Sequence, residues 1–233
     1  MNKLFAFGCS MTRGDALDDI WDFELKQTDP DAGPSKYSWP QVLANNMNLD
    51  CVNLGESGAS NKQIWYRLVT THMTEGDIAF VQWTSVNRWC VLNDDKIQQI
   101  NPYRTSKQSL SFYENLHTDI DADYDANLRM SHADYHAKSI GVKLYHLTFD
   151  KSAISTTNAT IRNLPFNTTE TLNSDLHELQ KDIYKEYITD THDFNTGYSM
   201  TRGSANDKTD KKWGHPCAIT HKLHAYNLYE EIS

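Results

Sequence analysis

The chain has 233 residues, of which 39% are hydrophobic and 23% are charged, and its formal net charge is −9. Because the chain is acidic and has no basic run, its composition argues against nucleic-acid binding as the main activity. No apolar run reaches the roughly 18 residues that span a bilayer and no secretory signal is visible, so we expect a cytoplasmic protein without a membrane partner. No shift in composition marks a linker, and we expect residues 1–233 to form one domain.

Strands and helices alternate along the first half of the chain. Residues 1–7 are short and apolar, as in a buried strand, whereas 15–34 are acidic and rich in Gly and Pro, as in a surface excursion. The pairs Ser38/Gln41 and Ser60/Gln63 have the spacing of capping boxes, which predicts two helix starts. The expected strands are 1–7, 50–54, 78–83 and 142–149, and the expected helices follow Ser38 and Ser60 or cover 120–139, 172–188 and 218–232.

This order of elements predicts the α/β class. Strand, helix, strand, helix and strand in succession indicate a mainly parallel sheet with helices on its faces, which is a three-layer α/β/α sandwich. In the helix at 120–139 the apolar pattern includes Tyr124, Leu128 and Tyr135. Three segments have no clear pattern. Residues 87–118 are polar and unassigned, and 161–166 are a short candidate for a fifth strand. Residues 189–212 have the composition of a long loop.

A serine follows the first strand, in the segment Gly8-Cys9-Ser10-Met11-Thr12. In open α/β sheets, ligands bind outside the carboxyl ends of the strands, so this position suits a functional residue. Gly55-Glu56-Ser57-Gly58-Ala59-Ser60 follows the second strand, Asn87 follows the third, and His215-Pro216 lies near the end of the chain. In this order, these segments resemble the four sequence blocks of the SGNH (GDSL-like) hydrolases.

The resemblance implies the flavodoxin-like sheet of the SGNH hydrolase fold and the activity of a serine esterase. It implies that Ser10 is the nucleophile and His215 the general base, a role that suits a side chain with a pKa near neutrality. It further implies that Ser10 N–H, Gly58 N–H and the Asn87 side chain hold the oxyanion, with no cofactor and no metal. The expected substrate is a small-molecule or carbohydrate ester, with O-acetyl as the first choice of acyl group. Transfer to an acceptor other than water would use the same residues.

Two positions depart from the family's pattern. Cys9 stands where the family commonly has an aspartate, and we expect a buried, reduced thiol there, as for the other three of the four scattered cysteines. Lys212 stands three residues before His215, where the triad aspartate is usual. Asp210 could orient His215 through a rearranged loop, a backbone carbonyl could do so instead, or catalysis is impaired. The alternative function is therefore an SGNH-like carbohydrate-binding or structural module.

The donor at the third strand also has alternatives. Asn87 lies about one residue later than the family's block suggests, and Thr84 or Ser85 could take its place. The neighbouring Arg88 could hold an anionic group of the substrate, or it could form a surface salt bridge.

Histidine and tryptophan residues elsewhere admit two interpretations as well. His132 and His136 have the i, i+4 spacing of helical metal ligands, but no third ligand is evident beside them, so we expect no metal site. His221 and His224 are expected to be solvated or to pack on the terminal helix. Trp89 and Trp213 flank the expected site and could stack on a sugar, or they belong to the core. The sequence does not indicate an oligomeric state.

Overall fold

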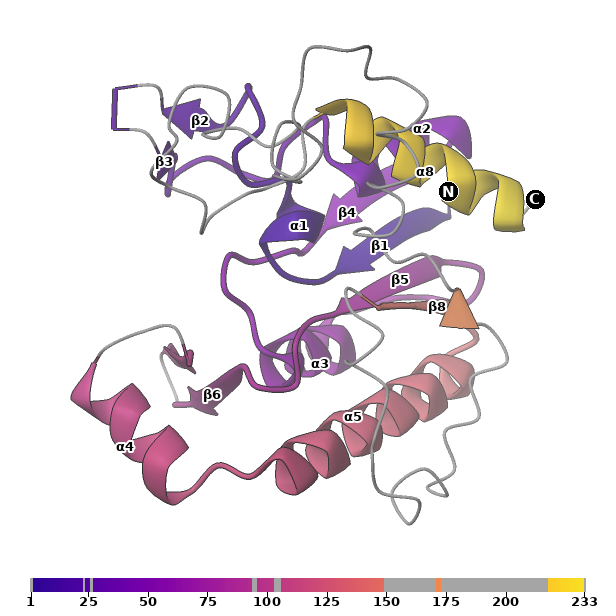
Figure 1. Cartoon of the computed structure of the whole chain (residues 1–233). Coiled ribbons are helices and arrows are strands. Elements are labelled where there is room, and N and C mark those ends of the chain that lie inside the picture. Colours follow the sequence, from indigo (N-terminus) through magenta and orange to yellow (C-terminus); the bar gives the residue numbers. More distant parts are fainter. Residues whose placement is uncertain are drawn as a thin grey trace, which may run out of the picture.

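A parallel sheet of five strands forms the centre of this computed structural model (Figure 1). The strands lie in the order β4-β1-β5-β8-β9, and every neighbouring pair is parallel. Their bounds are Asp50–Asn53 (β4), Lys3–Phe7 (β1), Ile78–Trp83 (β5), Lys143–Thr148 (β8) and Thr171–Leu172 (β9). The structure describes residues 2–22, 24–25, 27–93, 96–102, 106–148, 171–172 and 218–232.

Helices cover both faces of the sheet, as the α/β/α prediction requires. α2 (Trp39–Asn46) and α8 (Ala218–Ile232) lie over one face, and α3 (Asn61–Thr70) and α5 (Asp119–Ser139) lie over the other (Figure 1). Because side chains alternate across a strand, β1 contributes side chains to the core on both faces of the sheet. Phe5 and Phe7 join the core with α3 and α5, whereas Leu4 and Ala6 join the core with α2 and α8. The three-layer sandwich is confirmed.

The carboxyl ends of these parallel strands lie at one edge of the sheet. After β1 the chain forms the short helix α1 (Ser10–Arg13), after β4 it turns through residues 54–60 into α3, and after β5 it turns through residues 84–88. These three turns are therefore neighbours in space although they are far apart in the sequence.

Two hairpins and a helix extend from this edge. β2 (Trp21–Asp22) and β3 (Gln27–Thr28) form a small antiparallel pair within the predicted excursion 15–34. The segment 87–118, which the sequence left unassigned, contains the antiparallel strands β6 (Trp89–Leu92) and β7 (Ile97–Ile100) and then α4 (Lys107–Asn115). The short hairpin has little periodicity of its own, so its pairing is visible only in the fold.

Of the two predicted capping boxes, only the serine half of the second is found among the described residues. Ser60 caps α3 as expected, and its side chain accepts a hydrogen bond from Gln63 N–H. Ser38 takes the N-cap position of α2 but makes no such bond. Its hydroxyl instead donates to Ser35 O at 2.6 Å, because a turn outside the helix competes for it. Gln41 bonds Asn45 on the exposed side of α2.

The predicted apolar positions on α5 are also wrong. Tyr135 is 73% exposed and Leu128 is 51% exposed, and Tyr124 lies on the same outer surface. α5 instead packs its small side chains against the sheet and α3, because small side chains allow a short distance between the packed elements. The buried residues of this face include Ala122, Ala126, Met130, Ala133 and Ala137.

Several predictions fall outside the described residues or agree with them in part. The candidate strand 161–166 lies outside, and so does 173–188 of the predicted helix 172–188, while Leu172 belongs to β9. Cys9 and Cys90 are buried free thiols and Cys51 is partly buried and free, as expected. Burial raises the pKa of Cys51 to about 12, so this thiol stays protonated near neutral pH.

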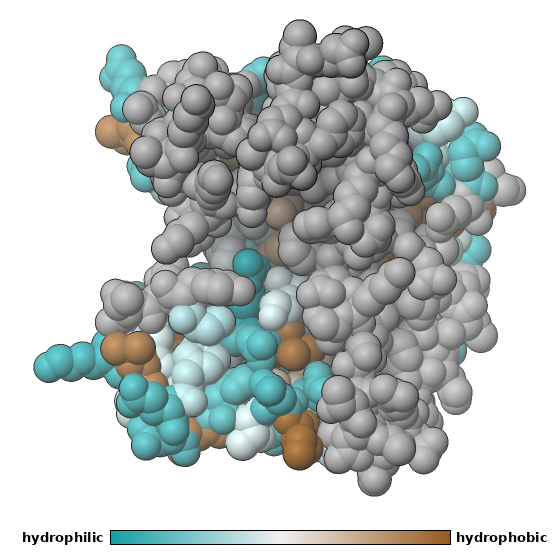
Figure 2. Space-filling view, in the orientation of Figure 1, coloured by the Kyte–Doolittle hydropathy of each residue, from teal (hydrophilic) through white to brown (hydrophobic). Residues whose placement is uncertain are grey.

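None of the described helices combines the length and apolar character needed to cross a membrane. Figure 2 shows the described surface over α4 and α5 as mostly hydrophilic, with apolar atoms in separate spots.

Candidate active site

Ser10 is the first residue of α1 and lies directly beyond the carboxyl end of β1. It is 8% exposed, and no hydrogen bond to its hydroxyl is found among the described residues. As the first helical residue, its backbone N–H has no partner within the helix. A side-chain hydrogen bond attaches this turn to β5. Thr12 Oγ1 donates to Gln82 Oε1 at 2.6 Å, and both side chains are buried. The preceding Cys9 is buried, as predicted.

Gly58 lies in the turn that follows β4, next to Ser10's turn. Its φ of 74° falls in the left-handed region, which favours glycine. Among the backbone hydrogen bonds of the described residues, none uses Gly58 N–H as its donor. The two turns are joined directly, because Glu56 N–H donates to Gly8 O at 3.0 Å.

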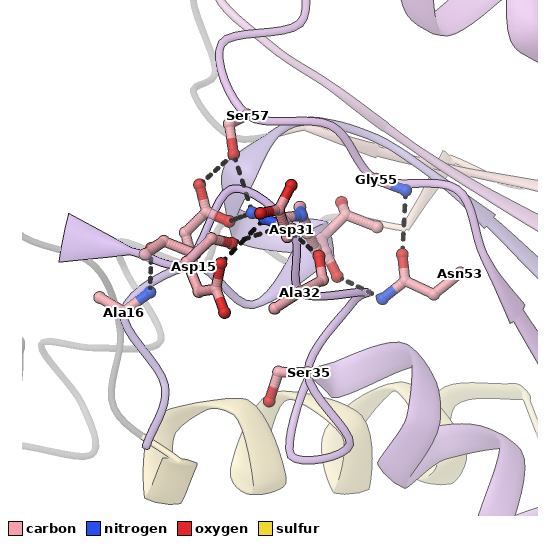
Figure 3. A network of polar contacts seen from close by, with 12 residues as sticks. Asp15, Ala16, Asp31, Ala32, Ser35, Asn53, Gly55 and Ser57 are labelled. Atoms are coloured by element: carbon pink, nitrogen blue, oxygen red, sulfur yellow. Dashed lines mark hydrogen bonds and ion pairs between the residues drawn. The ribbon is translucent and has the colours of Figure 1, made fainter. Parts of the chain in front are cut away.

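Gly55 explains how closely these two turns approach each other. A Cβ at this position would lie 2.4 Å from Arg13 N and 2.9 Å from Arg13 Cα, so only glycine fits against the backbone of α1. Asn53 strengthens the contact, since its Nδ2 donates to Thr12 O at 2.7 Å and its Oδ1 accepts from Gly55 N–H at 3.0 Å. Figure 3 shows Asn53 and Gly55 beside this contact.

A buried ion pair in the α1 segment provides a further connection to the Gly58 turn through Ser57, and the sequence did not suggest it. Arg13 Nη1 lies 2.8 Å from Asp15 Oδ1, and the two side chains are 13% and 8% exposed. Ser57, next to Gly58, donates its hydroxyl to Asp15 Oδ2, as Figure 3 shows. Arg13 Nη2 donates to Ala32 O and so also holds the excursion 15–34. Arg13 and Asp15 stand near Ser10 in the sequence, but only their burial distinguishes them from ordinary surface charges.

An open, polar cavity of about 780 Å³ lies beside this network. Arg13, Asp15, Asn53, Glu56 and Arg67 line it together with Gln27, Thr28, Pro30, Ala32 and Pro34. Its charges are largely paired within the protein, since Arg67 also lies against Glu56. The cavity therefore offers hydrogen bonds to a polar ligand and no strong net charge.

Asn87 lies beyond β5, at the same edge of the sheet. Its backbone carbonyl accepts a hydrogen bond from Tyr113 Oη on α4, and its side-chain Oδ1 is buried without a hydrogen-bond partner in the described part of the chain. It lines a second cavity, of about 320 Å³, with Tyr113, Glu114 and His117. The alternative donor Thr84 uses its backbone N–H and O to bind the Asn61 amide at 2.8 and 3.0 Å.

The hairpin β6–β7 packs against the Gly58 turn. Gln99 on β7 donates from Nε2 to Ser57 O at 2.9 Å, and a Cβ on Gly58 would meet Gln99 Oε1 at 2.6 Å. Trp89 on β6 has its ring 5.7 Å from that of Phe112 and faces the Lys62 ammonium. It is thus packed on one side rather than free to stack on a ligand from both.

Four of the described histidines are buried or already hydrogen-bonded. His146 and His224 are buried, and burial lowers the pKa of each to about 3. His221 is buried too and accepts a hydrogen bond from Trp39 N–H through Nδ1, so His221 and His224 pack rather than face solvent. His132 accepts from Trp65 Nε1. Among the described residues, no group of three His, Cys, Asp or Glu side chains is arranged to hold a metal ion.

His215, Asp210, Lys212 and Trp213 lie outside the described residues. The site that can be described therefore consists of Ser10, Gly58 and Asn87 at the ends of three neighbouring strands. Among these, Ser10 and Gly58 are brought together by direct contacts between their turns.

Comparison with solved structures identifies the fold. A carbohydrate esterase, reported for the divergent catalytic and non-catalytic binding functions of its active site, aligns with a TM-score of 0.52 at 10% identity over 99% of this chain and 68% of the other. This chain has the α/β/α fold of that esterase. The predicted three-layer α/β/α fold with a mainly parallel sheet is thereby confirmed.

Two more distant matches are an acetyl xylan esterase, Est2A, from the rumen bacterium Butyrivibrio proteoclasticus and a lipolytic G-D-S-L protein from Veillonella parvula DSM 2008. The first has a TM-score of 0.46 at 13% identity over 99% of this chain and 63% of the other. The second has a TM-score of 0.42 at 16% identity over 99% and 97%. No protein-family model and no curated protein matches the sequence.

Proposed function

We propose that the chain is a serine esterase that hydrolyses a small ester, with an O-acetyl group on a carbohydrate as the first choice. The observation that carries this proposal is the pairing of two turns: Ser10 N–H and Gly58 N–H both lack a partner among the described residues, and the Glu56–Gly8 hydrogen bond holds their turns together. Adjacent free N–H groups beside a serine hydroxyl are the arrangement that a developing oxyanion requires.

The reaction proceeds in two steps. His215 takes the proton of Ser10 Oγ as this oxygen attacks the ester carbonyl, and the Ser10 and Gly58 N–H groups and the Asn87 side chain bind the resulting oxyanion. The C–O bond to the alcohol then breaks, and His215 returns the proton to the leaving oxygen. A water molecule, deprotonated by His215, attacks the acyl-enzyme in the second step and releases the acid and the free serine.

The attachment of α8 supports the role of His215. Trp39 N–H, at the start of α2, donates to His221 Nδ1 on α8 at 3.0 Å. The start of α2 lies at the Ser10 edge, since Asn53 Nδ2 bonds both Ser38 Oγ and Thr12 O. α8 therefore begins at this edge, and His215 stands three residues before it, a distance of at most about 11 Å along an extended chain.

The orientation of His215 is assigned to Asp210. Lys212 stands at the usual position of the triad aspartate, so Asp210 has to reach Nδ1 through a different course of the chain. If Asp210 has this role, Asp210→Asn lowers kcat by a large factor, up to about 10⁴ as in serine proteases. An activity that Asp210→Asn leaves unchanged assigns the orientation to a backbone carbonyl instead.

A second candidate is a binding module with little catalysis. Lys212 in the aspartate position favours it, and the polar cavity beside Arg13 and Asp15 offers a place for a neutral, polar ligand such as a glycan. The fold is compatible with both, because function depends on the site rather than on the fold.

The test compares the wild-type chain with Ser10→Ala and Ser139→Ala. Ser139 is an exposed serine at the end of α5, at the opposite edge of the sheet. We expect hydrolysis of p-nitrophenyl acetate and labelling by a fluorophosphonate in the wild type and in Ser139→Ala, and neither in Ser10→Ala. Absent labelling, or equal turnover in all three proteins, contradicts the esterase and favours the binding module, which a glycan-binding screen then examines.

A further inference from the structure

Arg88 is a half-buried charge in the described part of the chain, and the proposed reaction leaves it without a role. Its Nε and Nη1 atoms are buried and have no hydrogen-bond partner among the residues that the structure describes. No ion pair among the described residues includes it, so the surface salt bridge that the sequence allowed is not found there. A buried charge without a partner is costly, and such groups in a native protein call for an explanation.

The backbone places Arg88 close to the proposed site. Arg88 directly precedes β6, and Cys90 on β6 pairs with Gln99 on β7. Gln99 in turn bonds Ser57 O and contacts Gly58. Strand spacings of about 5 Å across and 3.3 Å along put the Arg88 backbone roughly 8–9 Å from that of Gln99. Arg88 therefore begins the hairpin that covers the turn of the proposed oxyanion donor.

The charges around this hairpin do not neutralise Arg88. Lys62 Nζ lies 6.0 Å from the centre of the Trp89 ring, the residue after Arg88. Burial raises the pKa of the Cys90 thiol on β6, and among the nearby charges Lys62 and Arg129 lower it while Asp125 raises it. Asp125 already accepts hydrogen bonds from Arg129 Nε and Nη2. Lys62 is thus a second cation beside this hairpin, whereas Glu114 and Asp119 line the cavity beside the neighbouring Asn87.

We infer that Arg88 binds an anionic group, a carboxylate or a phosphate, on the molecule that occupies this edge of the sheet. The planar guanidinium of arginine matches the geometry of a carboxylate or a phosphate. Lys62, which lies over the Trp89 ring, adds a second positive charge. The proposed esterase then acts on esters that carry a negative charge. This last step rests on the proposed function, whereas the anion site does not.

Binding is tested by thermal unfolding with sodium phosphate or sodium succinate against sodium chloride at equal ionic strength. We expect either probe to raise the Tm of the wild type and of Lys3→Gln, which removes a charge at the opposite edge of the sheet. Arg88→Gln should weaken the affinity for either anion by about tenfold or more, and Arg88→Lys should retain part of this affinity. A response to only one probe identifies the anion as phosphate or carboxylate. No response, or an equal response in Arg88→Gln, overturns the inference.

The folded state without anion gives an independent readout. Because Arg88 has no partner in the described part of the chain, Arg88→Met should remove an uncompensated charge, and we expect its Tm to rise by about 2–4 °C. The same variant no longer responds to phosphate or succinate. A Tm that falls by more than about 5 °C, or an Arg88→Gln variant that does not fold, means that Arg88 makes a structural interaction and overturns the inference.

Activity tests the substrate class. We compare p-nitrophenyl acetate with the mono-p-nitrophenyl ester of succinate, which carries one carboxylate. Arg88→Gln should lower kcat/KM for the anionic ester by about tenfold or more and for the neutral ester by less than about threefold. Equal losses overturn the substrate inference. If the wild type hydrolyses neither ester but anions still raise its Tm through Arg88, the esterase proposal fails and the anion site stands.

Discussion

Asp15 is the side chain that couples the nucleophile's turn to the proposed oxyanion turn. It accepts from Arg13 on α1 and from Ser57 beside Gly58, and it is almost fully buried. An ion pair at this depth contributes little net stability compared with an apolar pair, but the loss of one partner leaves the other charge uncompensated. The pair thus fixes the geometry of the site more than it stabilises the fold.

Asp15→Asn keeps the shape of the side chain and removes its charge. We expect the free energy of unfolding to fall by about 2–4 kcal/mol, toward the lower end because Arg13 keeps its bond to Ala32 O. If the proposed reaction holds, kcat falls and KM changes little, because the separation of Ser10 N–H and Gly58 N–H acts on the transition state. Urea unfolding and steady-state kinetics measure both quantities. Asp50→Asn, at an exposed position on β4, should stay within about 0.5 kcal/mol of wild type.

The turn after β4 shows how whole elements are brought together without a side chain. Gly55 lets α1 and this turn touch through their backbones, and no apolar contact is needed there. The polar bonds of Asn53 and Glu56 then fix the register of the two turns. Both turns follow directly after strands that pair with each other, β1 and β4.

Gly55→Ala should therefore be far more damaging than an ordinary Gly→Ala change. Its Cβ would lie 2.4 Å from Arg13 N, so α1 has to move, and we expect a loss of about 1–3 kcal/mol or more. Gly33→Ala is the matched control, because no atom lies within 4 Å of the added Cβ. Chemical denaturation of both variants checks the prediction. Equal stabilities contradict the close approach of the two turns.

The face of α5 that contacts the sheet can be tested in the same manner. Met130 is 0% exposed in the core, whereas Leu128 is 51% exposed. We expect Met130→Ala to cost about 2–5 kcal/mol and Leu128→Ala less than about 0.5 kcal/mol. Unfolding in urea measures the two free energies. A larger loss for Leu128→Ala contradicts the observed orientation of the helix and restores the apolar pattern that the sequence suggested.

At the scale of the whole molecule, buried neutral histidines lie on both sides of the sheet. His146 on β8 accepts from Trp83 Nε1, and His224 on α8 lies edge-on to Trp39. Burial lowers the pKa of each to about 3. The unfolded chain binds protons at these residues below a pKa of about 6.5, but the folded protein does not do so until about 3.

The free energy of unfolding should therefore include the full contribution of these two histidines above about pH 6.5. It should decline as the pH falls from about 6.5 toward 3. Each histidine contributes a slope of about 1.4 kcal/mol per pH unit in this window. His224→Leu should flatten the dependence by the share of one histidine, while His72→Gln, at an exposed position, should leave it unchanged. Urea unfolding at several pH values, followed by tryptophan fluorescence, measures the slopes. A His224→Leu slope equal to that of the wild type contradicts a neutral, buried His224.

The sequence by itself determined the α/β class, the parallel strands β1, β4, β5 and β8 and the helix α8, because apolar periodicity and turn residues act locally. It also placed Ser10 and Gly58 at strand ends. The segment after β5 was not predictable, since the β6–β7 hairpin owes its place to the contact of Gln99 with the Gly58 turn.

Only the tertiary structure decided which polar residues are buried and which residues face each other. Asp15 and Arg88 are charged and would be expected at the surface, yet Asp15 is buried and two nitrogens of Arg88 are buried. Tyr124 and Leu128 are apolar enough for the core, yet both are exposed. The reason is that burial depends on which element covers a residue, and α5 presents its alanines to the sheet. Local sequence sets where a strand ends; packing between distant elements sets what that end can bind.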